Sequence, residues 1–203
     1  ENPIPAIKKD CQTAYINKTF ERLEKVKKLV PFTNQKFIKI NGVNRKNIFF
    51  FKDEVTEKIT KMFPKEFRLI HGDPTFSNIM LENREVKPIL IDPRGYFGNT
   101  KFFGDEDYDW AKLYYSLVGN YDQFNRKQFF LEIKEKEIDL QINSNNWEDT
   151  EEYFFKNLEN VNREKILLLH AIIWLSLTTY AWEDYDSICG AFYNGLIYLD
   201  KVL

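Results

Sequence analysis

Hydrophobic side chains recur with helical spacing over much of this chain. The clearest early case is segment 11–29, where apolar residues fall three or four positions apart and Lys and Glu occupy the other face. The same kind of pattern predicts further helices at 53–63, 109–117, 126–142, 148–158, 163–180 and 186–203. Beyond residue 120 we therefore expect a mostly helical chain.

The first half of the chain also carries short β-prone runs beside turn residues. Strands are expected at 37–40, 48–51, 79–81 and 88–91. Asn41-Gly42 is a turn pair between the first two, and a polar turn at 82–87 separates the last two. The predicted fold class is α+β, mainly α. No Pro/Gly/Ser-rich linker divides the sequence, so we expect residues 1–203 to form a single domain.

The composition narrows the class of protein. Hydrophobic residues make up 43% and charged residues 30% of the 203 residues, as in ordinary globular proteins. Lys and Arg number 29 against 31 Asp and Glu, a balance that argues against a nucleic-acid partner. The most apolar stretch, 166–177, is shorter than the roughly 20 residues of a membrane span, so no membrane partner is expected.

Two cysteines, Cys11 and Cys189, are too few for a disulfide framework, which favours a reducing, cytoplasmic location. The excess of Lys over Arg, with many Ile, Asn and Phe, is typical of an AT-rich bacterial genome.

The candidate functional Asp and Asn residues are clustered between Leu69 and Gly95. Asp73 and Asn78 lie on a loop that contains Pro74, and Asp92 ends the second of the two strands that follow. If the hairpin turns near Glu85, Asn78 and Asp92 are equidistant from its centre and meet at its open end. The spacing thus predicts two carboxylates and an amide oxygen at one point, a donor set that suits Mg²⁺ completed by substrate phosphates.

This order of residues resembles the catalytic and metal loops of the kinase fold. The pattern His-x-Asp, four residues, Asn, a short hairpin and Asp is shared, and the His-Gly-Asp form is similar to the aminoglycoside phosphotransferase and choline kinase family. The segment Asp107-Tyr108-Asp109-Trp110-Ala111 resembles the Tyr-Asp-Leu-Ala segment of that family. In motif detail the resemblance covers residues 69–117.

The resemblance implies a role for each matching position. Asp73 is the expected catalytic base that accepts the proton of the substrate hydroxyl. Asn78 and Asp92 are the expected Mg²⁺ ligands, and the ion held by Asp92 is expected to bridge the phosphates of ATP. His71 is expected to shape the catalytic loop, and Asp109 to accept backbone N–H bonds from it.

Two features depart from the family. Arg94 stands where many small-molecule kinases have a second acid; it is expected either to contact a phosphate or an anionic acceptor, or to pair with an acid such as Asp105. Before His71 there is a single glycine, Gly42, and no Gly-rich phosphate loop occurs. Together with the start at Glu1, this predicts the C-terminal lobe of a kinase-like fold, with its nucleotide-binding lobe upstream.

The sequence thus predicts an ATP-dependent phosphotransferase acting on a hydroxyl of a sugar, aminoglycoside or choline-like acceptor, with bacterial surface glycans as one setting. A non-catalytic kinase-like binding module is the alternative, and a metal hydrolase using His71, Asp73 and Asp92 is a third. His170 is expected in the core. The aromatic residues around Trp174 and Trp182 are expected either in the core or in a cage for a cationic substrate. The acidic cluster Glu183, Asp184 and Asp186 is expected either in an exposed loop or in contact with a polyhydroxyl or amine acceptor. Asp105 and Asp107 are expected in a solvated loop.

Overall fold

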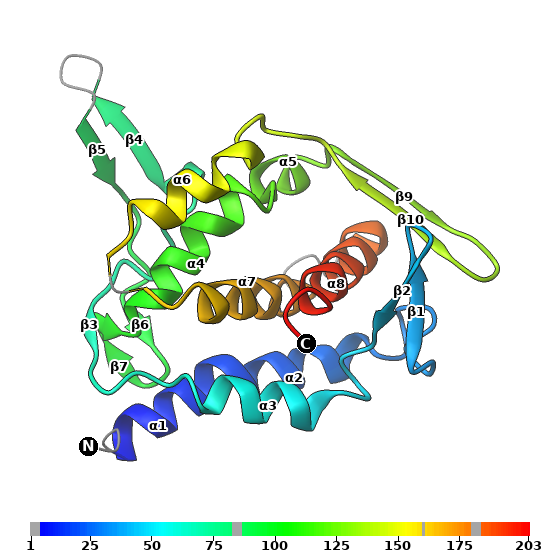
Figure 1. Ribbon diagram of the computed structural model, residues 1–203, viewed down its shortest axis with the longest axis horizontal. Coiled ribbons are helices and arrows are strands. Elements are labelled where there is room, and N and C mark those ends of the chain that lie inside the picture. The colour runs from blue at the N-terminus through cyan, green and yellow to red at the C-terminus, as the bar shows by residue number, and fades with distance from the viewer. Residues whose placement is uncertain (1–4, 83–86, 160, 180–183) are drawn as a thin grey trace.

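The computed structural model describes residues 5–82, 87–159, 161–179 and 184–203. It is an α+β fold in which helices outweigh several small sheets (Figure 1). The α-helices are α1 (Pro5–Cys11), α2 (Lys18–Val26), α3 (Lys52–Thr60), α4 (Glu106–Leu117), α5 (Tyr121–Asn125), α6 (Glu151–Lys156), α7 (Arg163–Leu177) and α8 (Tyr185–Leu199). A π-helical stretch, η1 (Gln12–Asn17), joins α1 to α2, and 3-10 turns lie at η2 (Phe76–Asn78) and η3 (Glu148–Thr150).

The hydrophobic core is built around α7. This helix packs against α8, α4 and α2 (Figure 1), and it is apolar on all sides, as expected of a helix surrounded by protein. His170 in its middle is fully buried and accepts a hydrogen bond from Trp174 Nε1 at 2.9 Å. Burial lowers the pKa of His170 to about 3, so it is a neutral core residue, as predicted.

Most of the predicted helices are present with shifted ends. The first begins earlier, at Pro5, and continues through η1 into α2. The helix predicted from Asp109 begins at Glu106, because the side chain of Asp105 caps it by accepting from the backbone N–H of Asp107. Tyr180, the predicted end of α7, lies outside the described residues.

The predicted helix at 126–142 is wrong, because this segment forms two strands. They are β9 (Phe129–Ile133) and β10 (Ile138–Ile142), in a four-stranded sheet of order β2-β1-β10-β9. In β10 the buried residues Ile138 and Leu140 alternate with more exposed ones, which is the period of a strand. Pairing with buried Ile40 of β1 places this alternation against the core.

The second strand of this hairpin was predicted at 48–51 but lies closer to the turn, at Val43–Lys46. The observed hairpin consists of β1 (Phe37–Ile40) and β2 (Val43–Lys46). Asn41 and Gly42 both have positive φ angles, 50° and 78°, as a two-residue hairpin turn requires, so pairing must resume at Val43. Ile48 is instead buried in the core.

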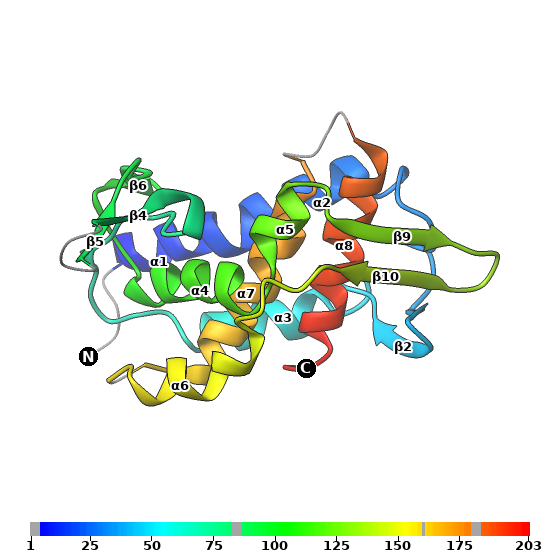
Figure 2. The ribbon, with the colours of Figure 1, turned by 90° about the horizontal axis from the view of Figure 1, so that it is seen from above.

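Three two-stranded ribbons surround the candidate site. They are β3 (Arg68–Leu69) with β8 (Phe103–Gly104), β4 (Ile79–Glu82) with β5 (Lys87–Leu90), and β6 (Tyr96–Phe97) with β7 (Thr100–Lys101). Figures 1 and 2 place them at one end of the molecule and the four-stranded sheet at the other, with the long helices between. Across the described ranges, no helix combines the length and apolar character needed to cross a bilayer.

Candidate functional site

One face of α4 holds the loop that carries Asp73. The carboxylate of Asp109 accepts from the backbone N–H groups of His71 (2.7 Å) and Gly72 (2.8 Å). Seven residues further along α4, Ser116 Oγ accepts from the backbone N–H of Phe76 at 3.1 Å. Because positions i and i+7 share a helix face, α4 fixes this loop at both ends. Burial raises the pKa of Asp109, although the bonds from His71 and Gly72 act in the opposite direction.

His71 uses both ring nitrogens inside the protein. Nε2 lies 2.8 Å from the carbonyl oxygen of Ile91, and Nδ1 accepts from the backbone N–H of Asp73 at 3.3 Å. These partners assign the neutral tautomer with the proton on Nε2. His71 therefore joins the loop to the end of β5, and neither ring nitrogen is left to bind a metal, which argues against the metal-hydrolase reading.

The two loops touch at Gly72 and Arg94. The backbone N–H of Arg94 donates to the carbonyl of His71 at 2.8 Å. Gly72 has φ +85°, and a Cβ atom there would lie 2.8 Å from Cβ of Arg94. Glycine is required at this position by both its backbone conformation and the close approach of Arg94.

The β4–β5 hairpin brings Asn78 and Asp92 together, with a register one residue from the predicted one. Ile79 pairs with Leu90, and the backbone N–H of Ile91 donates to the carbonyl of Asn78 at 3.0 Å. Asn78 thus faces Ile91, and Asp92 is the next residue along. The predicted turn at Glu85 lies outside the described residues. Asp92 has φ +54°, a left-handed conformation that is uncommon for residues other than glycine and is often found at functional sites.

Asn78 and Asp92 each have a side-chain oxygen that is available to bind a metal ion. Asn78 Nδ2 donates to the carbonyl of Asp73 at 2.8 Å, which turns Oδ1 away from that carbonyl. Within the described ranges the carboxylate of Asp92 has no hydrogen-bond or ion-pair partner, and it lines the pocket beside Asp73. Those ranges contain no group of three or more His, Cys, Asp or Glu side chains able to hold a metal. One carboxylate and one amide oxygen still fit Mg²⁺, which commonly takes few protein ligands and completes its shell with water and phosphate.

Lys112 is a site residue that sequence reasoning missed. Its Nζ lies 2.8 Å from Oδ1 of Asp73, whose side chain keeps 38% of its surface exposed. Burial alone lowers the pKa of Lys112, but Tyr108 and Asp73 more than offset this, and the net shift is upward. The spacing of Lys112, three positions after Asp109, placed it on the same helix face and could have identified it.

The side chain of Arg94 turns to two tyrosines. It donates to the hydroxyl groups of Tyr108 and Tyr96, both at 3.1 Å. Asp105, the acid considered as its partner, is instead bound by Lys165 of α7 and by the hydroxyl of Tyr15. Asp105 is 1% exposed, so the prediction of a solvated loop was wrong for this residue. The buried Lys165–Asp105 pair fixes the start of α4 against α7.

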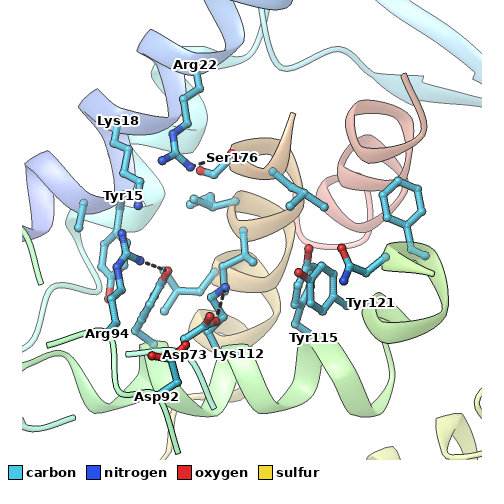
Figure 3. Close-up of a pocket in the computed structure, with 18 of the residues that line it drawn as sticks. Tyr15, Lys18, Arg22, Asp73, Asp92, Arg94, Lys112, Tyr115, Tyr121 and Ser176 are labelled. Carbon is cyan, nitrogen blue, oxygen red and sulfur yellow. Dashed lines mark hydrogen bonds and ion pairs between the residues drawn. The ribbon is translucent and has the colours of Figure 1, made fainter. Parts of the chain in front are cut away.

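A cavity of about 670 Å³ opens next to Asp73 and Asp92 (Figure 3). The π-helical stretch and α2 form one wall, α4 and α7 form the floor and back, and α5 closes the far end. Its lining includes Lys18 and Arg22 of α2, neither of which the sequence singled out. They lie about 50 residues before Asp73, and no local pattern links them to it.

Comparisons with known protein families, curated protein sequences and solved structures found no match to this chain. The candidate site therefore stands on its own geometry. Two features weighed from the sequence, Trp182 and Glu183, lie outside the described residues. Asp184 pairs with Lys127, and both cysteines are buried free thiols.

Proposed function

We propose that this chain is the helical catalytic lobe of a kinase-like enzyme that transfers the γ-phosphoryl group of ATP to a hydroxyl of a small molecule. The observation that carries the proposal is the convergence of Asp73, Asn78 and Asp92 on one loop-and-hairpin unit, with Asp109 fixing the backbone of that loop. Phosphoryl transfer depends mainly on positioning and charge neutralisation, and this arrangement supplies the means for both.

Asp73 is the proposed base. Its carboxylate is partly exposed at the cavity, and Lys112 holds one of its oxygens. The acceptor hydroxyl donates its proton to Asp73 while its oxygen attacks the γ-phosphorus. The bond from that phosphorus to the bridging oxygen breaks, and the electron pair leaves with ADP.

Asn78 and Asp92 are the proposed ligands of Mg²⁺. The ion, when bound, neutralises the negative charge of the nucleotide phosphates. The role of the protein is to hold the two side chains: the Asp73 carbonyl orients the amide of Asn78, and the hairpin fixes the backbone at Asp92.

The exposed apolar residues of the β4–β5 hairpin favour a nucleotide and a further lobe on the side of the Asp73 loop that carries this hairpin. Met80, Leu81, Ile89 and Leu90 are each 43–62% exposed on this ribbon. Apolar residues exposed so close together usually mark a surface covered by a ligand or by protein. An adenine ring and an upstream nucleotide-binding lobe of the same protein fit this surface, and a cytoplasmic location fits the need for ATP.

The cavity favours a small acceptor. A volume of about 670 Å³ lies within the usual size of small-molecule sites, roughly 300–1,000 Å³. Several of its walls are polar, with tyrosine hydroxyls, Ser176 and charged groups. A polyhydroxylated or sugar-like acceptor fits such a lining better than an apolar one.

Nucleotide binding tests the metal part of the proposal. Calorimetry on the natural polypeptide, with any residues that precede Glu1 in the cell, should show saturable binding of ATP that requires Mg²⁺. Asp92→Asn should weaken it by about tenfold or more, because a metal-bound carboxylate is lost, and Asp149→Asn, an exposed acid elsewhere, should leave it unchanged. Binding without any phosphoryl transfer would instead favour the non-catalytic module.

A further inference from the structure

The cavity beside Asp73 has a local excess of positive charge that the rest of the chain lacks. Its lining contains five cationic side chains, Lys18, Arg22, Arg94, Lys112 and Lys127, and two carboxylates, Asp73 and Asp92. The whole chain carries a formal charge of −2. Lys112 pairs with Asp73 and Lys127 with Asp184, so these two are neutralised inside the protein.

Lys18 is the most informative of the five cations. It is half-buried in the wall of the cavity, and within the described residues its ammonium group has no hydrogen-bond or ion-pair partner. Burial, followed by the repulsion of Arg94, Arg22 and Lys112, lowers its pKa to about 7. A partly desolvated amine without an anionic partner costs stability, and perturbed ionisable groups of this kind in a cleft are concentrated at functional sites.

Arg22 and Arg94 are held in place on either side of Lys18. Arg22 of α2 donates to the carbonyl of Ser176 of α7 at 2.9 Å, and both residues line the cavity. Arg94 is fixed by the hydroxyl groups of Tyr96 and Tyr108. Figure 3 shows Lys18 between the two guanidinium groups, on the opposite side of the cavity from Tyr115 and Tyr121.

The far side of the cavity is suited to a neutral polar group. The hydroxyl of Tyr115 is buried, has no hydrogen-bond partner within the described residues, and lines the cavity. The ring of Tyr115 stacks on that of Tyr121 with centroids 4.3 Å apart. The cavity thus has a cationic end and a hydroxyl-bearing end, with Asp73 between them.

We propose that the acceptor is anionic, and that Lys18, with Arg22 and Arg94, binds its phosphate or carboxylate group while Asp73 faces its hydroxyl. This rests on the proposed function, because it takes the cavity as the acceptor site of the same reaction. The phosphates of the donor nucleotide are the other possible source of an anion at this place. They are less favoured, because no described residue of β4 or β5, the strands beside which the nucleotide is proposed to lie, lines the cavity.

Anion binding without nucleotide is the first part of the test. Inorganic phosphate is titrated into the natural polypeptide, followed by glucose and glucose 6-phosphate as a pair that differs only in the anionic group. The variants are Lys18→Met and, as a matched control, Lys28→Met at an exposed position just after α2. We expect saturable binding of phosphate, and tighter binding of glucose 6-phosphate than of glucose. Lys18→Met, but not Lys28→Met, should lower the affinity for phosphate and for glucose 6-phosphate by about tenfold or more, which is the size of one charge-assisted hydrogen bond.

Titration of Mg²⁺-ATP into the same variants separates the two sources of anion. We expect Lys18→Met to bind Mg²⁺-ATP as the wild type does, and phosphate to bind in its presence. Equal weakening of Mg²⁺-ATP, or displacement of phosphate by it, would assign the cations to the donor and overturn the proposal, as would phosphate binding that does not depend on Lys18. Absence of phosphoryl transfer in a protein that keeps Lys18-dependent phosphate binding would count against the proposed function and not against the anion site.

Discussion

Lys112 Nζ lies 2.8 Å from Oδ1 of Asp73, and this contact fixes the carboxylate at the edge of the cavity. Lys112 comes from the same face of α4 as Asp109 and Ser116, which bind the backbone on either side of Asp73. One helix face therefore positions the backbone of the loop and the side chain that the loop presents. In a reaction governed by geometry, displacement of this side chain by about 1 Å can cost a hundredfold in rate.

Replacing Lys112 by Met should separate positioning from binding. With the ion pair gone, Asp73 is free to adopt other rotamers, so kcat for phosphoryl transfer should fall by about 100-fold. The dissociation constant for Mg²⁺-ATP should not change, because Lys112 is not among the proposed metal ligands. Steady-state kinetics and calorimetry on Lys112→Met and on the exposed control Lys28→Met measure both quantities. A kcat equal to that of the wild type contradicts the positioning role.

Asp109→Asn should loosen the loop that carries Asp73. The amide can accept only one of the two backbone N–H bonds, and its own NH₂ group then faces the other donor, so we expect a loss of about 1–3 kcal/mol in the free energy of unfolding. Urea denaturation measures this loss, and hydrogen exchange at the amides of His71 and Gly72 should become faster. The matched control is Asp149→Asn. Unchanged protection of both amides would show that Asp109 does not hold the loop.

Gly72→Ala should cost more stability than Gly42→Ala. Both glycines have positive φ, +85° and +78°, and alanine in that conformation costs about 1–2 kcal/mol. At Gly42 the new Cβ meets open space, whereas at Gly72 it meets Cβ of Arg94, whose backbone is tied to His71. We expect the Gly72 variant to lose about 1–3 kcal/mol more, from overpacking. Equal losses in thermal or urea unfolding would mean that the two loops are not packed as described.

Lys18 should make the stability of the protein depend on pH. Its pKa is lowered from 10.5 to about 7 in the folded state, so between these values the unfolded chain binds more protons and stability rises with pH. Below about pH 7 the full cost of the buried charge is present. Lys18→Met should therefore be more stable than the wild type by about 1–3 kcal/mol near pH 6, after allowance for partial solvent screening. The gap should close toward pH 10, and a variant that is less stable near pH 6 contradicts this assignment.

Local sequence patterns were enough to place the short hairpin and the residues around it. The spacing of Asp73, Asn78 and Asp92 depends on a loop and two adjacent strands, and the register differed from the predicted one by a single residue. By contrast, the segment predicted as a helix, 126–142, forms two strands. Its last part, Ile138–Ile142, alternates apolar and polar residues, which is the period of a strand and could have been recognised locally. Its pairing with β9 is local, but its pairing with β1, nearly 100 residues earlier, is encoded by no local pattern. Lys18 and Arg22 reach the cavity through the packing of α2 against α7, which no local pattern encodes.

In the proposed reaction, Asp73 accepts the proton of the acceptor hydroxyl. The most direct measurement is the rate of ADP formation from Mg²⁺-ATP with an acceptor, in the natural polypeptide and in Asp73→Asn. The amide keeps the size of the carboxylate but cannot take the proton, so we expect a rate lower by a factor of about 10²–10⁴, with Mg²⁺-ATP binding intact. A variant that forms ADP at the wild-type rate would show that Asp73 is not the base.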